Sequence, residues 1–260
     1  MLFLRSLIFN AAFYIVLFGL VFLGAPVMLL GRHAVFVLAR TWARVSIWLL
    51  RVICGVKVEF RGVEHVPKGA FILAAKHQSV WETFALTLFC PDYSFLLKRE
   101  LTFIPFFGWM LVSSEQIVID RAKGGSALTQ AVRKSRALLE QGRQIIVFPE
   151  GTRRAVHAPP SYKPGVAAIY GACNVACVPA ALNSGLFWPR RQFLRRPGTI
   201  LVEFMPPIAP GMDKKSFMRL LSDQIETATI RLTEEALARD AGLAAAFPRP
   251  DERAPVEGAA

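Results

Sequence analysis

The sequence predicts an α/β fold, a mixed and mostly parallel sheet flanked by helices and preceded by an N-terminal pair of membrane-associated helices. Two observations lead to this prediction. From Val56 onward, short apolar runs alternate with helical stretches, which is typical of a sheet covered on both faces. Before it, the run Ser6–Gly31 has no charged residue. We therefore expect a membrane anchor and interfacial helix over 1–54, a globular domain over 55–240, and a disordered tail over 241–260.

The composition favours membrane lipids over nucleic acid as the anionic partner of this chain. The 260 residues carry a formal net charge of +12 and are 53% hydrophobic, with a mean hydropathy of +0.39 and a pI near 10.1. A strong positive charge suits either kind of polyanion. So apolar a chain is uncommon among nucleic-acid binders, and no known nucleic-acid module is recognisable in it.

The four cysteines predict buried thiols in a reducing compartment rather than disulfides or a metal centre. They form no C-x-x-C pair, and no histidine lies near Cys173 and Cys177 in the sequence. The other two are Cys54 and Cys90. We therefore expect no metal.

The uncharged run Ser6–Gly31 predicts a retained helix that is long enough to cross a membrane. At 1.5 Å per residue it would extend about 39 Å, more than the ~30 Å of a hydrocarbon core. A cleaved signal peptide is the alternative, but the run is longer than such an apolar region and no A-x-A-like site follows it. Arginine is in excess after the run, which predicts the bulk of the chain on the cytoplasmic face of a bacterial inner membrane. These residues are Arg32, Arg40, Arg44 and Arg51, against Arg5 before the run.

The next segment, His33–Ile53, predicts a helix for the membrane interface. Its basic residues fall within one narrow stripe at 100° per residue, and aromatic and aliphatic residues cover the other faces. An amphipathic helix packed on the core of the domain is the alternative. A later segment, Leu186–Arg196, interleaves aromatic residues with arginines and predicts an interfacial loop.

In the globular part, seven short apolar runs predict strands. They are Val56–Phe60, Ala70–Ala75, Ser94–Leu97, Gln116–Ile119, Gln144–Phe148, Val175–Ala181 and Thr199–Phe204. Apolar residues at helical spacing predict four helices between and after them. These are Trp81–Phe89, Ser126–Gln141, Gly165–Ala172, and a last helix that Asp213 can cap and that runs to about Ala238.

The end of the second predicted strand carries a histidine followed by a carboxylate. His77 lies just before a predicted helix, at the edge where α/β proteins usually place their sites, and Glu82 follows five residues later. From the first turns of that helix, a carboxylate can reach the imidazole, fix its tautomer and stabilise the imidazolium. The pair predicts a general base, with a purely structural pair as the alternative.

A second polar turn follows the predicted strand Gln144–Phe148. Pro149 cannot continue a strand, and Gly151 allows the backbone to approach a ligand closely. Arg153 offers the planar, always charged group that binds phosphate through two hydrogen bonds. The turn predicts a phosphate site, with a solvated ion pair between Glu150 and Arg153 as the alternative.

Both turns resemble sequence blocks of the glycerolipid acyltransferase family, especially its 1-acyl-glycerol-3-phosphate acyltransferases. His77-x4-Glu82 is similar to the first block and Phe148–Arg153 to the third. The second block, Lys98–Trp109 with Ile119-Asp120-Arg121, and the fourth, Val178–Asn183, complete the family's order. The resemblance covers roughly residues 56–207. One departure is the first block, usually Asn-His-x4-Asp, which here has Lys76 before the histidine and Glu82 as the carboxylate.

The resemblance implies a glycerolipid acyltransferase-like fold and acyl transfer from acyl-CoA or acyl carrier protein to lysophosphatidate, giving phosphatidic acid without a cofactor. It implies His77 as the general base and Glu82 as its orienting carboxylate. For the acceptor phosphate it implies Lys98, Arg99, Arg121, Glu150, Gly151, Thr152 and Arg153. For the acyl donor or its tunnel it implies Phe103, Pro105, Phe107, Gly108, Trp109 and Pro179. The alternatives are acylation of a different lysophospholipid or lyso-amino-acid lipid, and a catalytically impaired membrane-bound lipid-binding protein.

Overall fold

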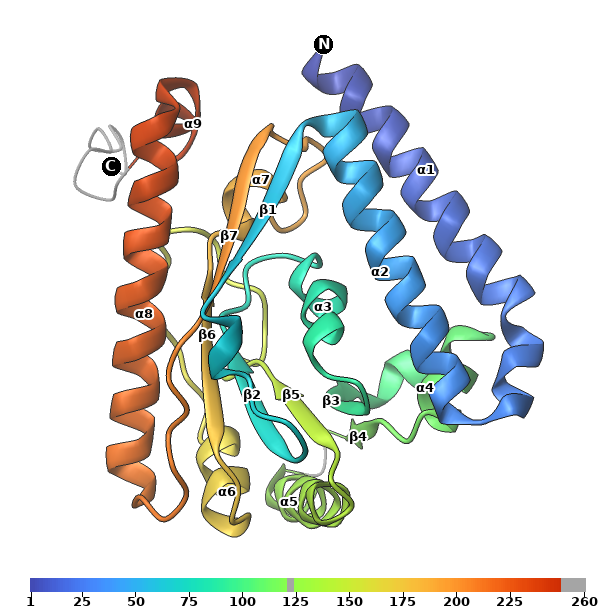
Figure 1. Ribbon diagram of the computed structural model, residues 1–260, viewed down its shortest axis with the longest axis vertical. Coiled ribbons are helices and arrows are strands. Elements are labelled where there is room, and N and C mark those ends of the chain that lie inside the picture. Colours follow the sequence, from blue (N-terminus) through green and yellow to red (C-terminus); the bar gives the residue numbers. More distant parts are fainter. Residues whose placement is uncertain (121–123, 249–260) are drawn as a thin grey trace, which may run out of the picture.

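Two long helices precede the sheet in the computed structural model, which describes residues 1–120 and 124–248. Helix α1 covers Leu2–Leu23, a 3-10 helix covers Ala25–Leu30, and α2 covers Arg32–Cys54. Figure 1 shows α1 and α2 side by side along one edge of the molecule. The predicted uncharged helix therefore ends earlier than Gly31, because Pro26 near the start of the 3-10 helix has no N–H for an α-helical hydrogen bond.

Seven strands form one sheet, and their positions follow the predicted apolar runs within about two residues. They are β1 Val56–Arg61, β2 Phe71–Ala75, β3 Tyr93–Lys98, β4 Ile117–Ile119, β5 Gln144–Val147, β6 Cys177–Leu182 and β7 Gly198–Phe204. The strand order is β1-β7-β6-β2-β5-β3-β4. All neighbouring pairs are parallel except β6 with β7, so the predicted mixed, mostly parallel sheet is confirmed.

The shorter helices connect the strands, and a long one follows the last strand. They are α3 Glu82–Ala85, α4 Phe107–Ser113, α5 Gly124–Glu140, α6 Gly165–Ala172, α7 Ser184–Phe187, α8 Lys214–Arg239 and α9 Ala241–Ala246. Short 3-10 helices cover Val63–His65, Leu86–Phe89 and Arg99–Phe103. As the sequence predicts, Asp213 caps α8, and its side chain accepts hydrogen bonds from the backbone amides of Lys215 and Ser216.

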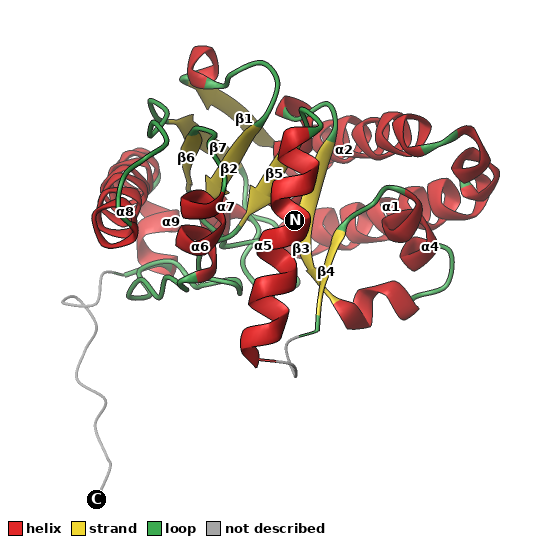
Figure 2. Cartoon of the chain, turned by 90° about the horizontal axis from the view of Figure 1, so that it is seen from below, coloured by secondary structure: helices red, strands yellow, loops and turns green. Residues whose placement is uncertain are grey.

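The sheet separates two hydrophobic cores, and alternate residues of each central strand belong to opposite ones. In β2, Leu73 packs with residues of α1, α2 and α3, whereas Ile72 packs with residues of α5, α6 and α8. Figures 1 and 2 show α8 on one side of the sheet and the α1–α2 pair on the other. All four cysteines are buried, as predicted.

Helix α2 is packed on the domain by one side, which corresponds to the alternative interpretation of its sequence. Phe36, Ala43 and Leu50 are buried in the core beneath it. Trp48 and Val52 remain exposed on the opposite side. The helix therefore has both a core-facing side and an apolar side that no part of the described chain covers.

The region predicted as a disordered tail begins with a helix. Asp240 accepts a hydrogen bond from the amide of Leu243 and so caps α9, and Leu243 is buried in the core. A short helix of alanine and leucine is stabilised here by burial of one side chain, which composition does not reveal. Residues 249–260 lie outside the described part of the chain.

Candidate active site

His77 and Glu82 contact each other at the end of β2, as the sequence predicts. Atom Nδ1 of His77 lies 2.9 Å from Oε1 of Glu82, the first residue of α3. The Glu82 side chain is fully buried, whereas 12% of the His77 side chain is exposed. Part of the imidazole therefore reaches solvent, while the carboxylate is held inside the protein.

Three further donors hold the Glu82 carboxylate. The backbone amides of Gln78 and Ser79 each donate to Oε1 at 2.6 Å. The hydroxyl of Ser184, from α7, donates to Oε2 at 2.8 Å. Because a carboxylate only accepts hydrogen bonds, Nδ1 of His77 carries the proton in this pair, and Nε2 is left with its lone pair.

Phe148 orients the ring of His77 from the neighbouring strand end. The two ring centroids lie 4.0 Å apart and the rings are nearly parallel, with 15° between their planes. Phe148 in turn stacks on Phe95 at 6.1 Å. The hydrogen bond to Glu82 and this stack together fix the position and the tilt of the imidazole.

The two turns predicted to carry the chemistry lie against each other. The carbonyl oxygen of His77 accepts a hydrogen bond from the amide of Arg154 at 2.7 Å. In the second turn, the amide of Gly151 donates to the carbonyl oxygen of Phe148 at 2.8 Å, and Gly151 has φ +65°, a conformation that favours glycine. The structure thus brings Arg153 to the same edge of the sheet as His77.

The predicted phosphate-binding residues differ in how they are held. The guanidinium of Arg153 forms no ion pair with the described residues. The backbone carbonyl oxygen of Arg153 accepts a hydrogen bond from the guanidinium of Arg190 at 2.8 Å. Lys98 is exposed at the end of β3. Arg99 is engaged with Asp120 at 3.0 Å. Thr152 is exposed, and Arg121 lies outside the described residues.

Glu150 faces the interior rather than the side where a ligand would bind. Only 1% of its side chain is exposed, and Oε1 lies 3.1 Å from the ammonium nitrogen of Lys76. Burial raises the pKa of Glu150 above its usual value, while Lys76 lowers it. Lys76 precedes His77, but its ammonium group contacts Glu226 of α8, whereas the imidazole contacts Glu82 of α3 on the other side of the sheet.

Half of the residues assigned to the acyl donor lie exposed in an apolar patch. The side chains of Phe103 and Trp109 are 67% and 55% exposed, and Ile104 and Val112 extend the same surface. Gly108 is buried, and a Cβ atom there would collide with the backbone of Thr102. Two further assigned residues are Pro105, which is exposed, and Phe107, which is half-buried.

Pro179 lies apart from this patch. It is a buried residue of β6, and β2 and β5 separate that strand from β3 in the sheet. Its carbonyl oxygen accepts a hydrogen bond from the amide of Met205 at 3.0 Å, so its backbone is used in sheet pairing.

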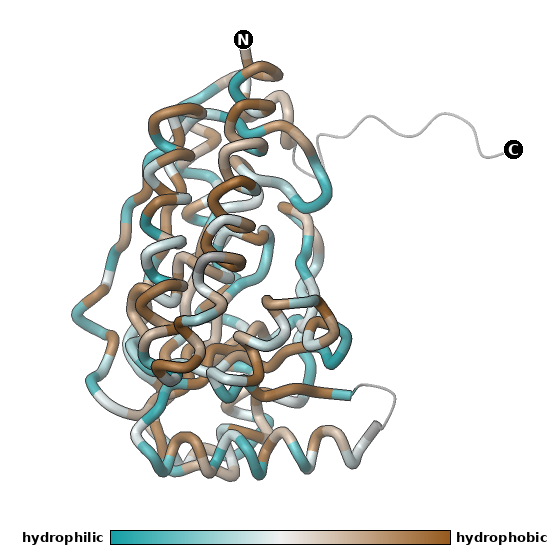
Figure 3. Tube along the Cα trace, turned by 90° about the vertical axis from the view of Figure 1, so that its right-hand side faces the viewer, coloured by the Kyte–Doolittle hydropathy of each residue, from teal (hydrophilic) through white to brown (hydrophobic). Residues whose placement is uncertain are grey.

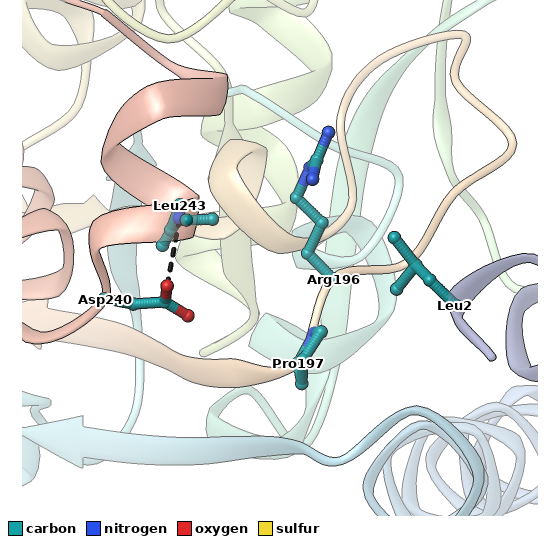
Figure 4. A pocket seen from close by; sticks show the side chains of 6 residues that line it. Leu2, Arg196, Pro197, Asp240 and Leu243 are labelled. Atoms are coloured by element: carbon teal, nitrogen blue, oxygen red, sulfur yellow. Dashed lines mark hydrogen bonds between the residues drawn. The ribbon is translucent and has the colours of Figure 1, made fainter.

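A cavity of about 190 Å³ lies between the start of α1 and the start of α9 (Figure 4). It is lined by Leu2, Arg196, Pro197, Asp240, Gly242 and Leu243. None of the residues around His77 lines it, so this cavity is not the place of the chemistry that the histidine supports.

Sequence reasoning did not assign a role to three residues that support the site. Ser184 binds Glu82, Phe148 stacks on His77, and Arg190 is bonded to the turn that carries Arg153. Two of them had a signal: Phe148 begins the third sequence block, and Arg190 lies in the arginine-rich segment predicted as an interfacial loop. That loop prediction is wrong for its first part, because Leu186, Phe187 and Trp188 are buried in the core.

Comparisons with known proteins agree with the resemblance. The sequence profile of a family described as Acyltransferase matches residues 57–183. The chain is 38% identical over 182 residues to a 1-acyl-sn-glycerol-3-phosphate acyltransferase of Pseudomonas aeruginosa, over 70% of each chain. It is 29% identical over 164 residues to the enzyme of that name from Limnanthes alba, covering 62% of this chain and 57% of that one.

A solved structure has a similar fold. The crystal structure of the 1-acyl-sn-glycerophosphate (LPA) acyltransferase PlsC from Thermotoga maritima superposes with a TM-score of 0.76 and 22% sequence identity. The match covers 89% of this chain and 98% of that chain.

Proposed function

Because the chain belongs to the 1-acyl-sn-glycerol-3-phosphate acyltransferase family, we propose that it transfers a fatty acyl group to the free hydroxyl of 1-acyl-glycerol-3-phosphate. The donor is acyl-CoA or acyl carrier protein, and the product is phosphatidic acid. The observation that carries the proposal is the 2.9 Å contact between His77 and Glu82, which leaves Nε2 of His77 accessible as a base.

In this mechanism His77 acts as the general base without an acyl-enzyme intermediate. Nε2 takes the proton of the acceptor hydroxyl as its oxygen attacks the thioester carbonyl. The imidazolium that forms is stabilised by Glu82, whose own charge is compensated by two amides and the Ser184 hydroxyl. When the tetrahedral intermediate collapses, the carbon–sulfur bond breaks and the thiolate takes the proton back from His77.

The acceptor phosphate is bound by Arg153 with Lys98. Arg153 is supported as the main ligand because its guanidinium is free of ion pairs with the described residues while Arg190 holds its backbone. Arg99 is less suited to bind the phosphate, because it already forms an ion pair with Asp120. Gly151 lets the backbone approach the phosphate, and Glu150 acts from behind the turn rather than on the ligand.

The protein works on a membrane, with its catalytic domain on the cytoplasmic face. Helix α1 is long and apolar enough to cross a bilayer, a test that core helices and signal sequences also pass. One flank is packed on the domain through Phe9 and Phe13, which contact Trp188. The opposite flank exposes Ile15 and Phe18 among other apolar residues, and Figure 3 shows how apolar this helix is.

Because one flank of α1 is packed on the domain, we propose that the helix lies in the membrane surface with its other flank in lipid. The ring of Phe22, near the end of α1, lies 4.8 Å from that of Phe106, next to the apolar patch around Trp109. The exposed flank of α1 and this patch therefore continue one surface, and we propose that both contact lipid.

The test is acyl transfer to lysophosphatidate in detergent micelles by the wild type and by His77→Ala. Palmitoyl-CoA and palmitoyl acyl carrier protein are supplied in separate reactions to identify the donor. We expect phosphatidic acid from the wild type only. Near-normal transfer by His77→Ala would exclude His77 as the base. Transfer by the wild type only to another lyso-lipid would replace the proposed acceptor.

A further inference from the structure

A buried lysine joins three elements behind the catalytic histidine. The ammonium nitrogen of Lys76 lies 3.1 Å from Oε1 of Glu150, and 2.7 and 3.0 Å from the two carboxylate oxygens of Glu226. Lys76 is 3% exposed and Glu226 18%. The hydroxyl of Tyr162 donates to Glu226 at 2.8 Å. One ammonium group is thus shared by two carboxylates from different parts of the chain.

Each member of this cluster adjoins a part of the proposed active site. Lys76 is the residue before His77. Glu150 lies in the turn that carries Arg153. Glu226 belongs to α8, which packs against the face of the sheet opposite α3. The cluster therefore connects the base, the phosphate ligand and the longest helix of the domain through one set of short ionic contacts.

The Glu150 carboxylate depends on this ammonium group. Lys76 and Glu226 face it, and Nε of Arg154 approaches its Oε1 only to 4.0 Å. Tyr162 is directed to Glu226 rather than to Glu150. The backbone amide of His77 also favours the charged form, by less than Lys76 does. Without Lys76, a buried carboxylate would keep a negative neighbour, Glu226, and lose its nearest cation, which is strongly unfavourable.

We propose that Lys76 is a positioning residue for the acyltransferase reaction: it neutralises Glu150 and holds the turn bearing Arg153 in place beside His77. Glu226, from α8, holds the ammonium group in turn. This inference rests on the proposed function, because the relative position of the two turns matters only if both act on one substrate. Neither Lys76 nor Glu226 touches the reacting atoms in this arrangement.

The expected effect of removing the ammonium group is a loss of acceptor binding that depends on pH. In Lys76→Met, Glu150 is charged and unpaired at high pH, so its turn moves and Arg153 is misplaced. At low pH Glu150 takes a proton, and the unfavourable charge disappears. The direction of this pH dependence follows from the pKa of Glu150, which burial raises. The destabilisation is fully present above the pKa that Glu150 has in the folded protein, and it is absent below the pKa that Glu150 has in the unfolded chain.

The experiment compares Lys76→Met and Glu226→Gln with Glu235→Gln, the matched control. Glu235 lies on the same helix and binds Arg61 at 2.8 Å, far from the catalytic turns. We expect the KM for lysophosphatidate to rise roughly tenfold in both cluster variants, with the donor KM and the control unchanged. The defect of Lys76→Met should shrink as the pH is lowered, whereas a general loss of stability would not alter the pH profile of the folded enzyme.

A second variant keeps the test valid if Lys76→Met folds poorly. In Lys76→Met/Glu150→Gln the unpaired charge is gone, so its melting temperature should return toward that of the wild type. A double variant as unstable as the single one would overturn the neutralising role. An active wild type with an unchanged acceptor KM in folded Lys76→Met would overturn the positioning role alone. A wild type inactive toward every lyso-lipid would overturn both proposals.

Discussion

The amide of Arg154 donates to the carbonyl oxygen of His77 at 2.7 Å, and this one bond joins the two turns that carry the proposed chemistry. It explains why residues more than seventy positions apart can act on one substrate, since His77 and Arg154 differ by 77 in number. The bond runs between backbone groups, so truncating the side chain of His77 or of Arg153 removes neither partner of the bond. These two side chains can therefore be tested separately.

The carboxylate of Glu82 should matter through its charge and through its length. In Glu82→Gln the imidazolium loses its stabilising charge, and we expect kcat to fall by roughly 10³ to 10⁴. In Glu82→Asp the charge stays but its contact with Nδ1 lengthens, so the loss should be about tenfold. Steady-state kinetics measure both. Equal rates for Glu82→Gln and the wild type would remove Glu82 from the mechanism.

Arg153 should control acceptor binding rather than turnover. Arg153→Ala removes the charge that binds the phosphate, and we expect the KM for lysophosphatidate to rise at least tenfold with a smaller effect on kcat. Arg136→Ala is the control, because Arg136 is an exposed cation on α5 that pairs with Glu140 in its own helix. Similar KM values for the two variants would place the phosphate elsewhere.

Arg143 should contribute to stability and not to catalysis. It is buried at the start of β5, 2.9 Å from Asp92 and 2.6 Å from Glu115. Arg143→Met should lower the free energy of unfolding by about 3 kcal/mol, at the low end for a buried pair because solvent screens the half-exposed Glu115. Urea denaturation measures this. The kcat of the folded variant should stay unchanged, because Arg143 lies at the opposite end of the strand from the site.

The exposed flank of α1 should determine membrane binding. Ile15→Gln and Phe18→Gln each remove an apolar side chain from lipid, and we expect roughly tenfold weaker partition per substitution. Sedimentation with anionic phospholipid vesicles measures it. Ile230→Gln is the control, since Ile230 is an equally exposed apolar residue on α8, away from this flank. If all three variants bind alike, α1 does not contact the lipid.

The cysteines should be unreactive in the folded protein. Burial raises the pKa of Cys54 to about 11, and it raises the pKa values of Cys90 and Cys177 further. Because the thiolate is the reactive form, a disulfide reagent at pH 8 should modify these residues only after the chain unfolds. Absorbance assays with and without denaturant count the reactive thiols. Rapid modification of the native protein would contradict their burial.

Local patterns were sufficient to predict the strands and the contact between His77 and Glu82. The contact between His77 and Glu82 is set by one turn, so spacing alone could indicate it. The bond from Ser184 to Glu82 spans 102 positions, and no local pattern reports it. Such contacts depend on how β6 and α7 pack beside β2, which only the folded chain determines.

Burial of charged residues was the second thing that the sequence did not reveal. Arg195 was expected at an interface, but it is buried, with its guanidinium 4.5 Å from the ring of Trp188. Asn10 of α1 accepts a hydrogen bond from it at 2.8 Å. Lys76 is buried in the same unexpected way. Lys76 is paired with carboxylates, whereas Arg195 contacts Asn10 and the Trp188 ring, and a sequence pattern shows the charge but not these distant partners.

The exposed flank of α1 also affects how the reaction should be measured. An enzyme held on a lipid surface meets its acceptor by diffusion in two dimensions, so the mole fraction of lysophosphatidate in that surface sets its rate. Adding inert detergent or phospholipid at a constant total amount of lysophosphatidate should then slow the reaction by surface dilution. A water-soluble donor would still be met from bulk solution, so the two substrates of one enzyme would follow different concentration scales.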